Sequence, residues 1–322
     1  MQPARVLRLR APVMRIGDQI RESVVFFGYS DKKQKSGIRC VGTGFLLEYD
    51  GVQYLVTAKH LSHSLGRDPF LIRVNRKDGT AENLPVDDVD WTEHPDPTVD
   101  VSAVPLTIED QHKYEADCLG VGFLFQPGEF DDLNIGVGSA TFTMGLFQLL
   151  SGEKRNLTIV HTGNIAMLPR DEKIPVVDWT DPDGKRRLHV EGYLVESLSL
   201  RGLSGSPVFV HTEINVDLRN FLMRREVQAG IITASGKLLP TEEPVIHVHR
   251  DAVKLLGLWQ GAWEAPPDEV LAAQTGDDVR VPVGIGVVVP LDKIIEVLEM
   301  PKLKDHRDES KKTDRSAAFS QN

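Results

Sequence analysis

Three short segments of the sequence contain a histidine, an aspartate and a serine, in that order along the chain. His60 ends one apolar run (YLVTAKH), Asp100 directly precedes another (VSAVPL), and Ser204 lies in a turn between glycines (RGLSGSP). A serine hydroxyl becomes a nucleophile when an imidazole accepts its proton and a carboxylate orients that imidazole. We therefore expect these three side chains to converge, with Asp96 or Asp90 as the competing choices for the carboxylate.

The turn that carries Ser204 has the features that a reactive hydroxyl requires. Gly202 and Gly205 let the backbone fold so that neighbouring N–H groups point at one spot, and they keep bulk away from the hydroxyl. An apolar run typical of a strand follows the serine. An esterase of the α/β-hydrolase class would instead have a helix there and the order serine, acid, histidine. Both differences argue against that class.

Two other groups of residues have the types that sites use. His247 and His249 are spaced to share one face of a strand, but no third ligand accompanies them, so we expect a solvated face rather than a metal site. Cys40 and Cys118 lie outside any glycine turn that would activate a thiol, and the sequence alone cannot pair them. We predict no metal and no cofactor.

The elements that must position these residues are mostly strands. Short apolar runs rich in β-branched and aromatic residues alternate with Gly, Pro, Asp and Asn, which is typical of strands joined by turns. Asp50-Gly51 between two such runs predicts a tight hairpin. Helical spacing of apolar residues occurs at 291–300 and 216–227. The expected strands are 23–29, 41–49, 52–58, 101–106, 138–146, 157–167, 206–211 and 283–289.

With these elements in place, the sequence resembles the chymotrypsin/trypsin-like serine peptidase family, in its bacterial form without a PDZ domain. The resemblance spans about residues 24–298. The matching motifs are the strand GTGF, the histidine motif TAKH, the aspartate strand DVSAVPL, the serine motif GLSGSP and the final strand GIGVVVP before a helix. It implies an all-β fold of two packed six-stranded antiparallel β-barrels with a C-terminal helix.

The resemblance also divides the chain. Residues 1–117 would form the barrel that carries the histidine and the aspartate. Residues 118–301 would form the barrel that carries the serine, with an insertion at about 211–251. The tail at 302–322 alternates charges and has few apolar residues, so we expect it to be disordered.

The same resemblance implies a role for each site residue. His60, Asp100 and Ser204 would form the catalytic triad of a serine endopeptidase that works through an acyl-enzyme intermediate. The backbone N–H groups of Gly202 and Ser204 would form the oxyanion hole. The segment 255–261 looks like the strand that lines the substrate pocket, with 229–233 as the rival alignment. The expected pocket residues are Leu198, Leu258, Trp259 and Gln260, and the leucine at 198 favours an apolar or small substrate residue.

Composition limits the partners. The net charge of −10 disfavours a nucleic-acid partner, which needs a basic surface, and likewise a surface that seeks anionic lipid. No run of about 20 apolar residues predicts a membrane helix. With only two cysteines and no clean signal peptide, we expect a cytoplasmic protein acting on protein or peptide substrates. The oligomeric state stays open, and the alternative function is a catalytically silent binding or regulatory module.

Overall fold

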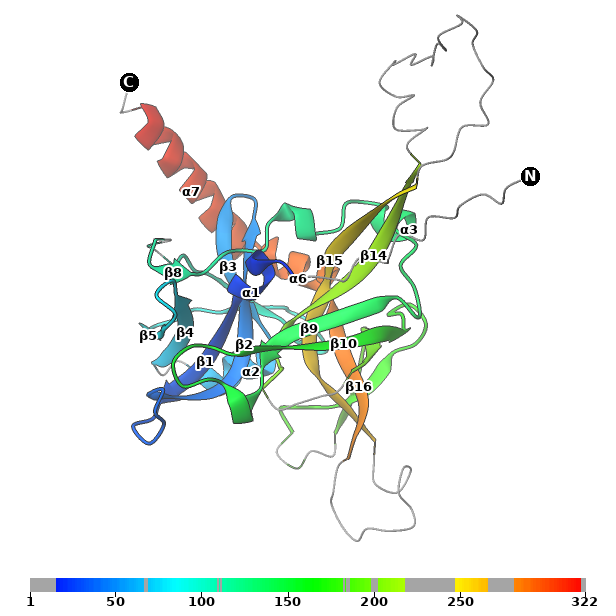
Figure 1. The fold of residues 1–322 in the computed structure, drawn as a ribbon, viewed down its shortest axis with the longest axis horizontal. Helices are drawn as coiled ribbons and strands as arrows, with labels where there is room; N and C mark the ends of the chain where they lie inside the picture. Colours follow the sequence, from blue (N-terminus) through cyan, green and yellow to red (C-terminus); the bar gives the residue numbers. More distant parts are fainter. Residues whose placement is uncertain are drawn as a thin grey trace, which may run out of the picture.

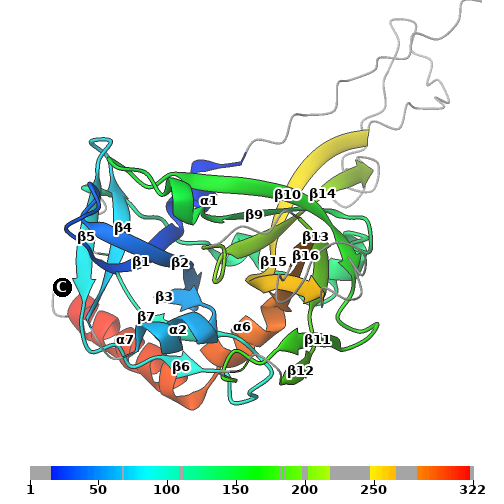
Figure 2. The same ribbon diagram turned by 90° about the horizontal axis from the view of Figure 1, so that it is seen from below.

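The computed structural model describes residues 16–66, 69–108, 110, 112–181, 183, 186–197, 202–217, 247–265 and 281–319. Figures 1 and 2 show two β structures side by side, an amino-terminal sheet and a carboxy-terminal barrel, with helices α6 (Leu291–Leu298) and α7 (Pro301–Phe319) along one side. Each apolar run expected to be a strand overlaps a strand of the structure. The Asp50-Gly51 hairpin is present, and both residues have positive φ (51° and 81°), as a tight two-residue turn requires.

Among the described residues the amino-terminal sheet does not close, so the expected first barrel is not confirmed. Its hydrogen-bonded order is β5-β4-β1-β2-β3-β7-β6, and β8 pairs with β4. The pairing stops at β5 on one side and at the two-residue strand β6 on the other. The strands are β1 (Val24–Ser30), β2 (Ile38–Tyr49), β3 (Val52–Thr57), β4 (Phe70–Arg76), β5 (Ala81–Val86), β6 (Thr92–Glu93), β7 (Ser102–Pro105) and β8 (Tyr114–Glu115).

The carboxy-terminal strands close into one six-stranded barrel in the order β10-β13-β16-β15-β14-β9, as expected for the second half. A separate two-stranded hairpin, β11–β12, lies beside it. The strands are β9 (Ala140–Leu146), β10 (Thr158–Met167), β11 (Ile174–Val177), β12 (Arg187–Val190), β13 (Tyr193–Glu196), β14 (Pro207–Asp217), β15 (His247–Ala265) and β16 (Val281–Pro290). β14 pairs along its whole length with residues 247–258 of β15, so the ends of the 211–251 insertion extend the barrel, while 218–246 lie outside the described residues. The expected helix at 216–227 therefore falls almost wholly outside them, as does the rival pocket strand at 229–233.

One apolar cluster joins the two halves. It runs from Phe26 and Phe45 in the sheet to Phe142 and Phe209 in the barrel and on to Ile294 in a helix. Because large side chains from both halves bury each other, the sheet and the barrel are held in a fixed relation. The chain division at 117/118 stays a prediction.

Helices α6 and α7 lie along the side where the sheet meets the barrel. Helix α6 matches the expected helix at 291–300, and it is followed at once by α7. The expected disordered tail is therefore wrong for residues up to 319: Leu303 and Arg307 are buried and hold this charged helix against the protein. The helices are α1 (Asp18–Glu22), α2 (Lys59–Leu65), α3 (Glu129–Asp132), α6 (Leu291–Leu298) and α7 (Pro301–Phe319), with 3-10 turns η1 (Val121–Phe123) and η2 (Gln148–Leu150).

Candidate active site

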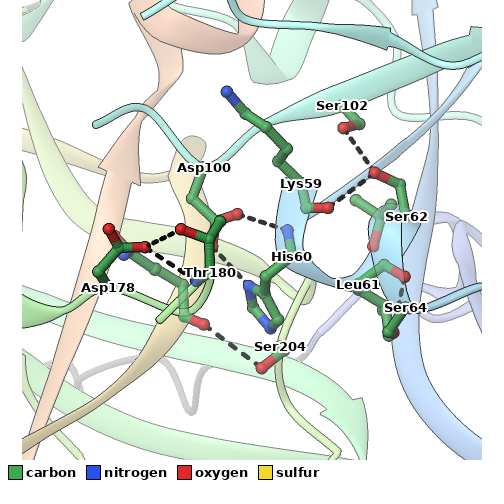
Figure 3. Close-up of polar contacts among 12 residues, drawn as sticks. Lys59, His60, Leu61, Ser62, Ser64, Asp100, Ser102, Asp178, Thr180 and Ser204 are labelled. Carbon is green, nitrogen blue, oxygen red and sulfur yellow. Dashed lines mark hydrogen bonds and ion pairs between the residues drawn. The ribbon is translucent and has the colours of Figure 1, made fainter. Parts of the chain in front are cut away.

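His60 and Asp100 are brought together by the start of helix α2. The helix follows β3 after a single residue, and its cap position is Ala58, which has no side chain to accept the first free N–H groups. Asp100 supplies that acceptor from across the sheet: its Oδ1 accepts the backbone N–H of His60 at 2.8 Å. Its Oδ2 lies 2.7 Å from Nδ1 of the same histidine. One carboxylate thus fixes both the backbone and the ring of His60 (Figure 3).

The loop that presents Asp100 is itself held by buried polar contacts. Lys59, only 6% exposed, donates from Nζ to the carbonyl of His94 at 2.8 Å. Ser62 of α2 and Ser102 of β7 share a hydroxyl–hydroxyl bond of 2.8 Å. Since these contacts join the helix to the segment on either side of Asp100, the carboxylate and the imidazole are positioned as one unit.

The competing carboxylates do not reach His60. Asp96 accepts hydrogen bonds from the backbone and hydroxyl of Thr98, and Asp90 forms an ion pair with Lys302 of α7. The structure brings Asp100 to the imidazole, in agreement with the order and spacing of the motifs.

The electrostatic setting of His60 suits a proton acceptor. Burial lowers the pKa of the imidazole, but the charge of Asp100 and its hydrogen bond outweigh burial, so the pKa of His60 is raised above its ordinary value. A carboxylate beside Nδ1 also fixes the tautomer, because Nδ1–H must donate to it. Nε2 is then left as the ring atom able to accept a proton.

The turn that carries Ser204 is shaped by two glycines with positive φ, Gly202 (103°) and Gly205 (82°). A Cβ on Gly205 would lie 2.1 Å from the carbonyl oxygen of Thr43, so only glycine fits there. Thr43 of β2 also holds the turn directly: its N–H donates to the carbonyl of Ser204 at 3.1 Å, and its hydroxyl donates to the carbonyl of Gly202 at 2.7 Å. The amino-terminal sheet therefore positions the serine turn of the barrel.

Ser204 lies at the same cleft as His60 and Asp100, but its hydroxyl points to another acceptor. Ser204 Oγ donates to the carbonyl of Gln260 at 3.3 Å, and among the described residues it has no hydrogen bond to His60 (Figure 3). Within the same part of the chain, the amides of Gly202 and Ser204 have no acceptor.

The cleft has a volume of about 290 Å³ and is mainly apolar. One wall is the β11–β12 hairpin, with Trp179 in its connecting turn. Trp179 stands edge-on to the ring of His63, with ring centroids 4.8 Å apart, and its centroid is 6.4 Å from that of His60. The lining residues are His60, Asp100, Pro175, Val176, Val177, Trp179, Arg187, Ser204, Gln260, Gly261, Ala262, Trp263 and Val287.

Only one of the four expected substrate-pocket residues lines the cleft among the described residues. Gln260 lines the cleft, whereas Leu258 and Trp259 are no more than 1% exposed and pack in two different apolar clusters: Leu258 in the one that joins the two halves, Trp259 in a second one made mainly of barrel residues. The residues of β15 that line the cleft are Gln260, Gly261, Ala262 and Trp263. Leu198 lies outside the described residues.

Two contributors were not singled out from the sequence. Thr43 stood within the GTGF motif, and its buried hydroxyl is what links the sheet to the serine turn. Trp179 lies in a polar stretch, DWTDPDG, that reads only as a loop. The one local signal is Asp178, whose side chain accepts from the backbone and hydroxyl of Thr180 and so shapes the turn around the tryptophan.

The two cysteines do not form a competing site. Cys40 and Cys118 are buried free thiols, and burial raises the pKa of Cys118 to about 12, which disfavours a reactive thiolate. Across the described residues, no three His, Cys, Asp or Glu side chains gather as metal ligands would. The side chains of His247 and His249 fall outside that description. None of the helices described is both long and apolar enough to cross a bilayer.

Comparison with known proteins finds likeness in structure and none in sequence. No protein-family model matches the sequence, and no curated protein is similar to it. A serine endoprotease from Yersinia pestis superposes with a TM-score of 0.45 and 13% identity, over 90% of this chain and 67% of that one. The inactive form of the Rv3671c protease gives 0.41 and 14%, over 87% of this chain and 88% of that one. At TM-scores below 0.5, neither likeness identifies a family or an activity for this chain.

Proposed function

We propose that this protein is a serine endopeptidase in which Ser204 is the nucleophile, His60 the general base and Asp100 the group that orients the base. The observation that carries the proposal is that one buried carboxylate accepts hydrogen bonds from both the backbone and the ring of His60, at the cleft that Ser204 also lines. A solvated or packing histidine needs no such carboxylate. A histidine that must present Nε2 to a hydroxyl does.

The proposed reaction begins with Ser204 turned toward His60. Its Oγ forms a bond to the carbonyl carbon of the substrate while its proton passes to Nε2 of His60. The amides of Gly202 and Ser204, which have no acceptor among the described residues, would donate to the oxyanion. The C–N bond then breaks as His60 returns the proton to the leaving amine, and water hydrolyses the acyl-serine by the same route.

One observation favours a second function, a protease-like module that binds without turnover. Ser204 Oγ donates to the carbonyl of Gln260 instead of His60. If that bond persisted with substrate present, the hydroxyl would never transfer its proton and the cleft would only bind. The two functions differ in whether Ser204 can be made nucleophilic.

Labelling with a fluorophosphonate probe separates them, because the probe reacts only with an activated serine. We expect labelling of the wild-type protein, none of Ser204→Ala and little of His60→Ala, with labelled Ser204 identified by mass spectrometry. Circular dichroism spectra must show that the variants are folded. Folded wild-type protein that is not labelled at Ser204 would favour the binding module.

A further inference from the structure

The wall of the cleft carries a cation that the proposed chemistry does not use. Arg187 of β12 pairs with Val177 of β11, so both side chains lie on the same face of the hairpin, and both line the cleft. The arginine side chain is exposed. Among the lining residues His60 and Asp100 pair with each other, and within the described part of the chain Arg187 has no ion-pair partner.

The adjacent arginine, Arg186, differs from Arg187 because its guanidinium is bonded within the hairpin. Arg186 donates from Nε to Asp178 at 2.6 Å, and its guanidinium also donates to the hydroxyl of Thr180. These bonds build the turn that holds Trp179. Of two consecutive arginines, one thus closes the loop and the other is left facing the cleft.

The hairpin is fixed strongly enough to present Arg187 at a defined place. Trp263 of β15 donates from its indole N–H to the carbonyl of Pro175 at 3.1 Å, which ties β11 to the barrel. The rest of this wall is apolar, formed by Val176, Ala262 and Val287. An exposed guanidinium keeps its charge and presents several donors in one plane, so it favours an anionic partner.

We infer that the cleft selects peptides in which an apolar side chain lies next to an aspartate or glutamate, with Arg187 pairing with the acid. The inference rests on the proposed function for the peptide to be cut, but recognition by Arg187 needs no hydrolysis. The apolar wall would take the neighbouring side chain. A planar guanidinium can bind a carboxylate through two parallel hydrogen bonds, which a neutral amide cannot match.

The test uses a degenerate peptide library and identifies cleaved peptides by mass spectrometry. With wild-type protein we expect acidic residues to be enriched near the cleaved bond, by roughly fivefold over their amide counterparts, the scale of a partly exposed ion pair. Arg187→Gln should abolish the enrichment, and Arg187→Glu should replace it with enrichment of lysine and arginine. Raising the salt concentration should weaken the wild-type preference.

The matched control is Lys32→Glu, which changes net charge by the same amount as Arg187→Glu but lies on the exposed turn between β1 and β2. It should leave the wild-type profile intact. A wild-type profile without acidic enrichment, or one that Arg187→Glu leaves unchanged, would overturn the inference while leaving the peptidase proposal standing.

A second arm keeps the inference testable if no cleavage occurs. The folded Ser204→Ala protein is immobilised, and retained library peptides are sequenced with and without Arg187→Glu. Enrichment of acidic peptides that depends on Arg187 supports recognition even where the fluorophosphonate experiment has rejected catalysis. Retention that ignores the charge at position 187 refutes it.

Discussion

The two sides of the candidate site are built in contrasting ways. His60 and Asp100 come from a helix start and a strand start in the amino-terminal sheet, and two short hydrogen bonds join them directly. Ser204 comes from a glycine turn of the barrel, and its hydroxyl makes one longer bond to a backbone carbonyl. His60 and Asp100 are therefore already joined, while the hydroxyl of Ser204 is bonded to a different acceptor. We therefore expect substitutions of His60 or Asp100 to alter the proton transfer, and substitutions in the serine turn to alter the position of the Ser204 hydroxyl.

The largest effect on the labelling rate is expected from Asp100→Asn, which changes the pair and leaves the serine turn intact. Asparagine can still accept the N–H of His60, but its NH₂ group would face Nδ1 and force that atom to accept. The proton then resides on Nε2, which can no longer take one from the serine. We expect the rate of fluorophosphonate labelling to fall by about 10⁴-fold. Asp96→Asn, whose carboxylate binds Thr98 instead, is the control and should label normally.

The pH profile of labelling tests the same pair. His60 must be neutral to accept a proton, and Asp100 raises its pKa above the ordinary 6.5. Labelling of the wild-type protein should therefore decline as the pH falls, with a midpoint above 6.5. Residual labelling of Asp100→Asn should decline at lower pH, because the negative charge that favours the imidazolium is gone. Identical midpoints in the two proteins would contradict the assigned pairing.

A smaller effect is expected where only placement changes. In Gly205→Ala the new methyl group would lie 2.1 Å from the Thr43 carbonyl and 2.3 Å from the Thr57 hydroxyl. The serine turn must shift, and misplacing a nucleophile by about 1 Å costs roughly 100-fold in rate. Labelling rates and urea unfolding measure the two consequences.

Gly51→Ala provides the matched control for that substitution. Gly51 has nearly the same φ, 81° against 82°, but nothing lies within 4 Å of a Cβ there. It should lose about 1 kcal/mol of stability from the unfavourable φ and label at the wild-type rate. If the two alanine variants behave alike, close approach to Thr43 does not position the serine.

The smallest effect should come from Thr43→Val, which keeps the shape of the side chain and removes its hydroxyl. That hydroxyl donates to Gly202 and accepts from the N–H of Leu146 at 2.9 Å. Leaving both partners buried should cost about 1–3 kcal/mol of stability, and we expect labelling to slow by roughly tenfold. Thr80→Val, in an exposed turn, should change neither. If Thr43→Val shifted the pH midpoint of labelling, the serine turn would also affect the His60–Asp100 pair, and the two parts of the site would not act independently.

The parts of this site that the sequence predicts are those encoded locally. Each motif can be recognised from its neighbours in the sequence: a strand-like run ends in His60, Asp100 stands before a strand, and Ser204 lies between glycines. The order of the three motifs along the chain then indicates that they meet. The strands themselves follow from short apolar runs bounded by turn residues. The turn at Asp50-Gly51 was predictable because positive φ restricts the residue types.

The parts that escaped prediction depend on contacts between distant segments. Closure of the first sheet would require pairing of its edge strands, and no local pattern in the two-residue strand at Thr92–Glu93 reports whether that happens. The cleft wall depends on Trp179 and Arg187, which are placed by a turn built from side-chain hydrogen bonds. Composition predicted a disordered tail. Composition contains no information on contacts with distant residues, and Arg307 is buried by such contacts.

Those partners of Arg307 have a consequence for how the chain must be made. Its guanidinium donates to the hydroxyl of Tyr54 at 3.3 Å and to the carbonyl of Leu298, and it lies over the ring of Tyr49. Leu303 belongs to the same apolar cluster as the amino-terminal strands. The amino-terminal sheet thus finishes its packing only with residues that the ribosome delivers some 250 positions after Tyr54. During synthesis this side of the sheet therefore stays uncovered until α7 has been made.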